Sequence, residues 1–417
     1  MIGIPPCNPE KLNSNNPEAI HAGWLLDGTG APARRNVRIR IDQGFIQSMR
    51  PADPPSGKDR SGVLDLTGHT VMPALIDSHV HLFLSGTGPP ELRRRQLEAE
   101  FDAAIDWIRS HARACLQCGI AAVRDGGDRR ALALRFRRNH EMGNAPLHIR
   151  AAGWAWHREG RYGRFIGRSV PEGSSLSGAI RADDSDADHI KIIQSGINSL
   201  RVFGRVGPAQ FSLPEMREAV IAAAERGLDA MVHANGEAAV RMALQAGCRS
   251  LEHGYFMGEE NLRRMAERKI FWVPTAGAML AYTEAGSLGG NEAEVSARTL
   301  EHQLGQMARA GELGVPIAVG TDAGSPGVEH GRALRRELDL LIQAGFSIEA
   351  AVCCASRNGA RLLRLSTLGT LRPGKRASLI AVPGGVAALP GSLRAISLCI
   401  YDGVVWGSSV KDGGGEG

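Results

Sequence analysis

Long apolar runs are missing from this sequence of 417 residues. No stretch approaches the ~18 uncharged apolar residues that a membrane helix needs, and the segment MIGIPPCNPEKLNSNN has neither the basic nor the apolar region of a signal peptide. An excess of one charge is missing too: 49 Lys and Arg residues against 44 Asp and Glu residues leave a net charge of +5, too dilute for a nucleic-acid footprint. We therefore expect a cytoplasmic protein with a small-molecule substrate and no membrane or nucleic-acid partner, and the sequence leaves a homo-oligomer open.

Cysteines are few and odd in number. The seven cysteines suit reduced thiols better than a disulfide framework. Cys115 and Cys118 form one C-x-x-C pair without a second pair, inside the helical-looking stretch AAIDWIRSHARACLQCG. Lone pairs of this kind are mostly ordinary buried small residues, so we assign this pair no metal or redox role.

Between about residues 71 and 366, short β-branched runs alternate with helical patterns. The expected strands are VMPALIDSH, GIAAVRD, LHIRAAG, HIKIIQ, LDAMVHA, SLEHG, IFWVPT and PIAVGTD. A capping box of Ser212 and Glu215 opens one helix, with Gly227 at its end, and Gly247 ends the next. Eight strand–helix units in under 300 residues are what an α/β fold of the (β/α)₈ barrel type requires. A doubly wound sheet is the alternative, but no G-x-G-x-x-G follows the first strand.

Both flanks of this region read as β structure. Val37, Ile39 and Ile41 alternate with polar residues, the period of a strand with one solvated face. Near the other end, Asp402-Gly403 between two β-rich runs predicts a tight hairpin. We expect a discontinuous β domain over 18–72 and 367–410, a barrel domain over 73–366, and a disordered tail over 411–417.

Metal-binding side chains stand where several of the expected strands end. Active sites of barrels lie at the C-terminal ends of the strands. The first run closes with His79 and His81, which alternation places on the same side, and later runs end with His233, His253 and Asp322. A single buried histidine is more often a satisfied core residue than a ligand. Four histidines and an aspartate at the ends of apolar runs favour a site for zinc or a similar divalent ion.

Lys191 lies inside the apolar run HIKIIQ. One interpretation is a lysine that extends to solvent from a strand edge. The other is a buried lysine, whose pKa falls toward neutrality, so that the neutral amine can react with carbon dioxide to give a carbamate. A carbamate is a carboxylate on a long side chain, and it could bridge two cations.

Together these motifs resemble the amidohydrolase superfamily, in particular its prolidase-like binuclear members with a carboxylated lysine. The matching segments are VMPALIDSHVH, HIKIIQSG, MVHANG, LEHGY and VGTDAG, and the resemblance runs from about Gly23 to Val382. It implies a distorted (β/α)₈ TIM barrel beside a small β-sandwich built from both chain ends. It also implies one metal held by His79, His81 and Asp322, a second held by His233 and His253, and carboxylated Lys191 bridging two divalent ions, which we expect to be zinc.

The resemblance also implies roles in substrate binding and catalysis. Asp322 would accept the proton of the attacking water and pass it to the leaving amine. His157 is similar to a histidine that supports the substrate carbonyl, although a plain loop histidine is an equal interpretation, and His330 is similar to a loop histidine near the site. Arg201 and Arg205 could hold a substrate carboxylate or form a solvated loop face. Asp77 and Glu252 adjoin predicted ligands and could orient imidazoles, unless regular alternation turns them away.

Four functions are compatible with these residues. The first is a prolidase-like hydrolase of amide bonds in dipeptides or N-acyl amino acids, and the second acts on a non-peptide amide, carbamate or lactone. A mononuclear deaminase keeps the H-x-H pair but usually lacks the lysine of the fourth strand, so Lys191 argues against it. An inactive scaffold barrel should show a broken ligand set, whereas no predicted ligand is missing here.

Overall fold

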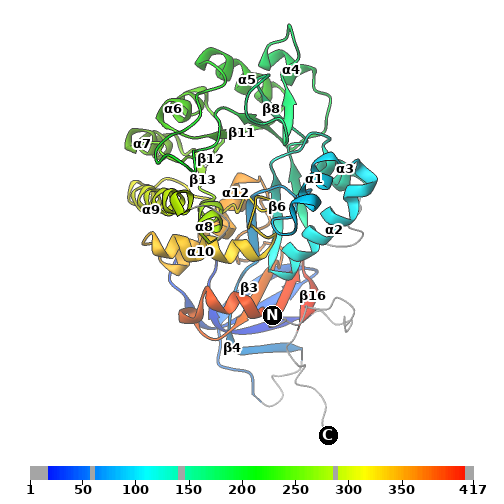
Figure 1. Cartoon of the computed structure of the whole chain (residues 1–417). Coiled ribbons are helices and arrows are strands. Elements are labelled where there is room, and N and C mark those ends of the chain that lie inside the picture. Colours follow the sequence, from blue (N-terminus) through cyan, green and yellow to red (C-terminus); the bar gives the residue numbers. More distant parts are fainter. Residues whose placement is uncertain (1–16, 57–61, 140–145, 285–289, 409–417) are drawn as a thin grey trace. The chain divides into compact units, whose positions relative to one another are not determined.

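The computed structural model describes residues 17–56, 62–139, 146–284 and 290–408 (Figure 1). The chain divides into two compact units, which are described separately here. The first contains the described residues up to Ile76, residues Ala114–Ala121, and those from Ser347 onward; the second contains Asp77–Arg113 and Ala122–Phe346. The tail predicted over 411–417 lies outside the described residues.

The first unit is built on one seven-stranded sheet that combines both ends of the chain. Its order is β16-β15-β14-β4-β1-β2-β3. The strands are β1 (Ala19–Leu25), β2 (Arg34–Asp42), β3 (Phe45–Pro51), β4 (Val63–Pro73), β14 (Leu379–Pro383), β15 (Leu398–Tyr401) and β16 (Val404–Ser408). β1 and β4 are parallel, and the other neighbours are antiparallel. Both flanking β regions are therefore present as predicted, and the ladders join them in a single sheet.

Local sequence explains these strands. Val37 and Ile39 are buried while Arg40 between Ile39 and Ile41 is exposed, so the predicted alternation of β2 is confirmed. Asp402 and Gly403 both have a positive φ, of 49° and 87°, as a tight hairpin turn of the predicted kind requires. The short helices of this unit are α11 (Ile348–Cys353), the π-helix Cys354–Asn358, α12 (Gly359–Leu362) and the 3₁₀ turns Val386–Ala388 and Gly391–Ala395.

The second unit carries parallel strands. One sheet has the order β13-β12-β11-β10-β8-β9, and a second has the order β5-β6-β7. The strands are β5 (Leu75–Val80), β6 (Ile120–Asp125), β7 (His148–Ala151), β8 (Ala155–His157), β9 (Gly167–Ser169), β10 (His189–Ile193), β11 (Asp229–Ala234), β12 (Ser250–His253) and β13 (Phe271–Val273). Parallel strands that alternate with helices are typical of mixed α/β folds.

Two of the eight expected strands differ from the prediction. The run VMPALIDSH is divided, because its first three residues end β4 and the rest forms β5. PIAVGTD is not a continuous strand in the structure. It makes an isolated parallel bridge at Ile317, and a second bridge follows directly after the run at Ala323. Backbone hydrogen bonds join Pro316 and Ala318 to Trp272, and Val319 to Ser78. The sequence reading missed β8 and β9, which are three residues each and too short to show a periodic pattern.

Helices follow most of the parallel strands. They are α1 (Pro90–Glu98), α2 (Phe101–Gln117), α3 (Leu132–Arg138), α4 (Leu176–Ala182), α5 (Leu213–Glu225), α6 (Glu237–Ala246), α7 (Glu259–Arg268), α8 (Ala276–Glu284), α9 (Gly290–Leu313) and α10 (Arg332–Gln343). Figure 1 shows α5, α6 and α7 on the outer side of β11 and β12.

The predicted helix ends are confirmed. The capping box of Ser212 and Glu215 opens α5, and Gly247 ends α6 in the left-handed conformation. Across the described ranges, no helix combines the length and apolar character needed to cross a membrane.

Candidate metal centre

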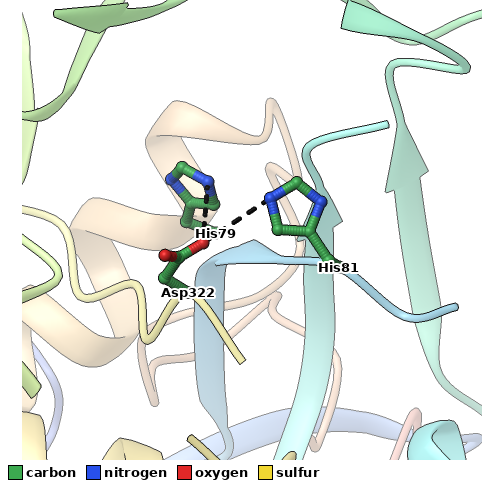
Figure 2. A group of neighbouring side chains, drawn as sticks. All are labelled: His79, His81 and Asp322. Atoms are coloured by element: carbon green, nitrogen blue, oxygen red, sulfur yellow. Dashed lines mark ion pairs between the residues drawn. The ribbon is translucent and has the colours of Figure 1, made fainter. Parts of the chain in front are cut away.

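Two imidazoles and a carboxylate meet at the end of β5. His79 Nε2 and His81 Nε2 each lie 3.5 Å from Asp322 Oδ1. Figure 2 shows both rings turned toward this carboxylate, with His79 on β5, His81 directly after β5, and Asp322 on a loop. Alternation along β5 explains why the histidines share a side. Their ligand atoms and that of Asp322 all lie within 4.8 Å of one another.

Hydrogen bonds fix which nitrogen of each ring is free. His79 Nδ1 donates to Glu252 Oε2 at 2.9 Å, and His81 Nδ1 donates to the Gly127 carbonyl at 3.1 Å. A carboxylate or carbonyl can only accept, so Nδ1 carries the proton and each Nε2 lone pair faces Asp322. Burial lowers the pKa of His81 to about 3 and that of His79 well below 6.5, which keeps both rings neutral. Neutral imidazoles with an oriented lone pair are metal ligands.

Asp322 is held in an unusual backbone conformation. Its φ is +58°, in the left-handed region that a non-glycine residue seldom adopts. The Asp322 amide donates to the His79 carbonyl at 2.8 Å, and Ser325 Oγ donates to Asp322 Oδ2 at 2.7 Å. The preceding residue, Thr321, is also held in place: its amide donates to Asp77 at 3.0 Å and its Oγ1 donates to Asp77 at 2.7 Å. These contacts hold Oδ1 of Asp322 toward the histidines.

Glu252 orients His79 from a buried charge network. Besides His79 Nδ1, it accepts from Arg124 Nη2 at 2.7 Å and from Ser250 Oγ at 2.5 Å. The prediction that Glu252 could orient an imidazole is confirmed, and regular alternation does not turn it away. The side chains of Glu252 and His253 both reach the cluster because His253 has a φ of +67° at the end of β12. Asp77 acts differently, since it accepts from the backbone amides of His79 and Thr321 rather than from an imidazole.

His233, His253 and Lys191 extend the same cluster. The His253 ring lies 5.0 Å from the His79 ring and 4.5 Å from the His233 ring, centroid to centroid. Lys191 Nζ lies 3.4 Å from His79 Nε2. His253 Nδ1 is 2.7 Å from Thr275 Oγ1, and burial lowers the pKa of His233 to about 3 and that of His253 well below 6.5. The four imidazoles and the lysine therefore form one continuous group.

Lys191 is buried without a counter-ion. Its side chain is 1% exposed, and within the described part of the chain its ammonium makes no ion pair. Burial lowers its pKa from 10.5 to about 8, with Glu252 opposing the shift. The interpretation of a lysine that reaches solvent is therefore excluded, and about a tenth of an amine with this pKa is neutral at pH 7.

The donor set fits divalent metal ions. Two neutral Nε2 atoms and a carboxylate oxygen match the ligands of zinc and related cations. His233 and His253 form a second imidazole pair, and no carboxylate joins them in a tight group among the residues described.

Two further predicted histidines, His157 and His330, are buried but do not belong to the group of His79, His81 and Asp322. His157 ends β8, is buried, and has Nδ1 2.9 Å from the Arg158 carbonyl. His330 is also buried, with Nε2 2.9 Å from the Leu84 carbonyl and its ring stacked on His111 at 4.4 Å, so it braces the chain after His81.

Arg201 and Arg205 are exposed, and the structure does not bring them to the cluster. The Arg201 side chain is 82% exposed and pairs with Glu292 at 3.1 Å, which gives its charge a partner on the surface. The solvated-face interpretation therefore describes the position of both arginines.

Sequence reasoning missed three contributors. Arg124 sits inside an apolar strand run, the same signal that singled out Lys191, and Thr275 closes the run IFWVPT. Tyr162 comes from the loop after β8 and packs on His233 with ring centroids 5.5 Å apart. No local pattern marks Tyr162, because its role depends on the path of the loop.

Known proteins and solved structures resemble this chain over most of its length. The family model described as "Amidohydrolase family" matches residues 70–404. An ochratoxinase of Aspergillus niger is 31% identical over 393 residues, which cover 87% of this chain and 80% of the relative. An uncharacterized protein of Mycobacterium tuberculosis is 27% identical over 409 residues, which cover 95% of this chain and 100% of that relative. A crystal structure of a Xaa-Pro dipeptidase with methionine bound in its active site superposes with a TM-score of 0.79 at 28% identity, over 94% of this chain and 99% of that one.

Proposed function

This chain belongs to the amidohydrolase family and is an enzyme acting on carbon–nitrogen bonds, and we propose that it hydrolyses the amide bond of dipeptides or N-acyl amino acids. The convergence of His79 and His81 on Asp322, with Lys191 Nζ 3.4 Å from His79 Nε2, carries the proposal. The similarity to a Xaa-Pro dipeptidase and to an ochratoxinase supports an amide substrate.

In this proposal the cluster holds two divalent ions, with zinc as the expected metal. His79, His81 and Asp322 hold one, and His233 and His253 hold the other. Lys191, carboxylated by carbon dioxide, is the shared anionic ligand. Its burial and its lowered pKa support this role, as does the finding that no carboxylate of the described residues groups tightly with His233 and His253.

Metal ions of this kind polarise a carbonyl and acidify water when bound. Asp322 takes the proton of the attacking water and passes it to the leaving amine. Burial raises the pKa of Asp322 to about 6, so the carboxylate is mostly ionised at pH 7 and still holds a proton readily. His157 is assigned to the substrate carbonyl, since it is buried at the end of β8.

We also propose that the parallel strands close into a (β/α)₈ barrel. Backbone hydrogen bonds support it: Asp188 donates to Ala151 between β7 and β10, and residues 316–319 bond with β13 on one side and with Ser78 on the other. The boundaries 73–366 for the barrel, and 18–72 with 367–410 for a β-sandwich, belong to the same proposal.

The test is metal analysis of the purified protein combined with turnover of a dipeptide and N-acyl amino acid library by the zinc-loaded enzyme. We expect about two ions per chain and hydrolysis of at least one amide class. Lys191→Ala should lose activity by ~10²-fold or more, and short carboxylic acids should restore part of it, because a diffusible carboxylate can replace the bridge. One ion per chain, or full activity in Lys191→Ala, would contradict the binuclear assignment.

A further inference from the structure

An arginine-rich pocket opens beside His157, and neither the catalytic cluster nor the comparisons assign it a role. Its ionisable lining residues are Arg129, His157, Glu159, Arg161, Arg164 and Arg168. They come from the loop after β6, from β8, from the loop that follows β8, and from β9. Four guanidinium groups face one carboxylate here, so the pocket has a clear excess of positive charge.

These four arginines are not neutralised by the protein. Over the described ranges none of them makes an ion pair, whereas many other arginines of this unit do, such as Arg130 with Glu100 and Arg158 with Glu215. Like charges gathered without counter-ions repel one another, and a bound anion relieves that repulsion. Guanidinium groups pair with carboxylates through two parallel hydrogen bonds, so a carboxylate suits this pocket.

The pocket is anchored rather than loose. The guanidinium of Arg168 lies over the Trp154 ring at 3.7 Å, and stacking on a ring face leaves its N–H donors available. Gln210 braces the loop that carries Arg161: its Oε1 accepts from the Arg158 amide at 2.9 Å and its Nε2 donates to the Tyr162 carbonyl at 2.8 Å.

The same loop connects the pocket to the metal centre. Tyr162, between Arg161 and Arg164, packs on His233, while His157 lines the pocket itself. Gly163 has a φ of +129°, and a Cβ there would lie 2.9 Å from His157 Cβ and 2.5 Å from Ile193 Cδ1, so the loop passes tightly against β8 and β10. The loop that carries Arg161 and Arg164 therefore also borders the metal centre, through the contact of Tyr162 with His233.

We propose that this arginine pocket binds a second carboxylate of the substrate, so that the enzyme acts on dipeptides or N-acyl amino acids that contain glutamate or aspartate. One carboxylate takes one or two guanidinium groups, and four arginines against Glu159 leave three positive charges. Three positive charges exceed what one carboxylate neutralises, so the pocket favours a substrate with two carboxylates over a substrate with one. The inference rests on the proposed amide hydrolysis, and it names the substrate class.

The experiment compares substrates that differ only in the second carboxylate. Ala-Glu is paired with Ala-Gln, and N-acetylglutamate with N-acetylglutamine, on the zinc-loaded wild type, on Arg161→Gln/Arg164→Gln, and on Arg217→Gln, which removes one charge from an exposed position of α5. We expect the wild type and Arg217→Gln to prefer the acidic partner by ~10-fold or more in kcat/KM. The double variant should lose that preference, because its kcat/KM should fall more for the acidic partner than for the amide partner.

A binding measurement separates this inference from the proposed activity. If no amide of the library is hydrolysed, the proposed function fails, and calorimetry with glutarate still tests the pocket. We expect glutarate to bind the wild type, to bind more weakly as NaCl is added, and to bind the double variant at least ~10-fold more weakly. Equal glutarate binding by the two proteins, or equal losses on the acidic and amide substrates, would overturn the assignment.

Discussion

The apolar face of the sheet in the first unit and the strand ends of the second unit are both buried, but for opposite reasons. The core cluster of the first unit consists entirely of apolar side chains, among them Ile20, Ile39 and Leu379. The ends of β5, β10, β11 and β12 instead bury imidazoles, an ammonium group and carboxylates. Burying apolar surface stabilises a fold, whereas burying charge destabilises it unless the groups are paired. The first region therefore serves stability, and the second is maintained for chemistry.

The largest test of this contrast is Glu252→Met. It removes the acceptor of His79 Nδ1 and leaves Arg124 buried without its counter-ion, so we expect the free energy of unfolding to fall by about 3–5 kcal/mol. Zinc affinity should fall by ~10–100-fold, because His79 loses the group that orients it. Unfolding by urea after chelation and a competition assay for zinc measure the two effects.

A double variant sharpens the same point. Arg124→Met/Glu252→Met replaces both charges by apolar side chains, so the chelated protein should be more stable than the single variant, while zinc affinity stays low. A double variant that is less stable than Glu252→Met would show that the pair is held for stability, which contradicts the contrast.

Ile39→Ala should have the next largest effect on the free energy of unfolding. Unlike Glu252→Met, it should leave metal binding unchanged. Ile39 is fully buried in β2, and its truncation should lower the free energy of unfolding by about 2–5 kcal/mol. Metal content and kcat per folded molecule should stay unchanged. Val404→Ala, at a residue 54% exposed on β16 of the same sheet, is the matched control and should change the urea midpoint little. A loss of kcat in folded Ile39→Ala would contradict the division of roles.

Glu337→Gln tests a smaller effect in the second unit. Burial raises the pKa of Glu337 from 4.5 to about 8, although its Oε1 accepts from the Gly277 amide at 2.7 Å. The folded state keeps this proton where the unfolded chain has lost it, so stability falls as the pH rises from about 4.5 to about 8. The glutamine variant cannot lose a proton, and its advantage in Tm should grow over that range by a few degrees, ~2–4 °C.

Thermal unfolding at pH 5 and pH 8.5 measures the effect. Glu301→Gln, at an exposed position of α9, is the control and should show no such trend. If Glu337→Gln shifts Tm equally at both pH values, the buried carboxyl is not the source of the pH dependence.

Local sequence predicted most of the elements because their signals are local. The alternation of β2, the capping box of α5 and the Asp402-Gly403 turn are each confirmed. PIAVGTD shows the limit of this reasoning. It has a strand-like composition, but its backbone makes only isolated bridges, and Asp322 at its end turns into the left-handed region.

The position of arginines shows a second limit. Arg201 and Arg205 were predicted either to hold a substrate carboxylate or to form a solvated loop face. Arg201 pairs with Glu292 on the surface, whereas Arg161 and Arg164, which are as exposed as Arg205, line a pocket. Arg161 and Arg164 drew no attention because they lie in a loop without a periodic pattern. Which arginine faces a pocket depends on the path of the loop, and only the folded chain decides it.

The sequence alone determined the kinds of ligand and their order along the chain: an H-x-H pair, a lysine, two single histidines and an aspartate, each at or in an apolar strand run. The tertiary structure decided which ring nitrogens are free, since His79 takes its orientation from Glu252, 173 residues away. It also decided that His253 and Asp322 reach the cluster through left-handed backbone. Strand periodicity acts over a few residues, whereas these contacts depend on how distant segments pack, and no local pattern encodes that packing.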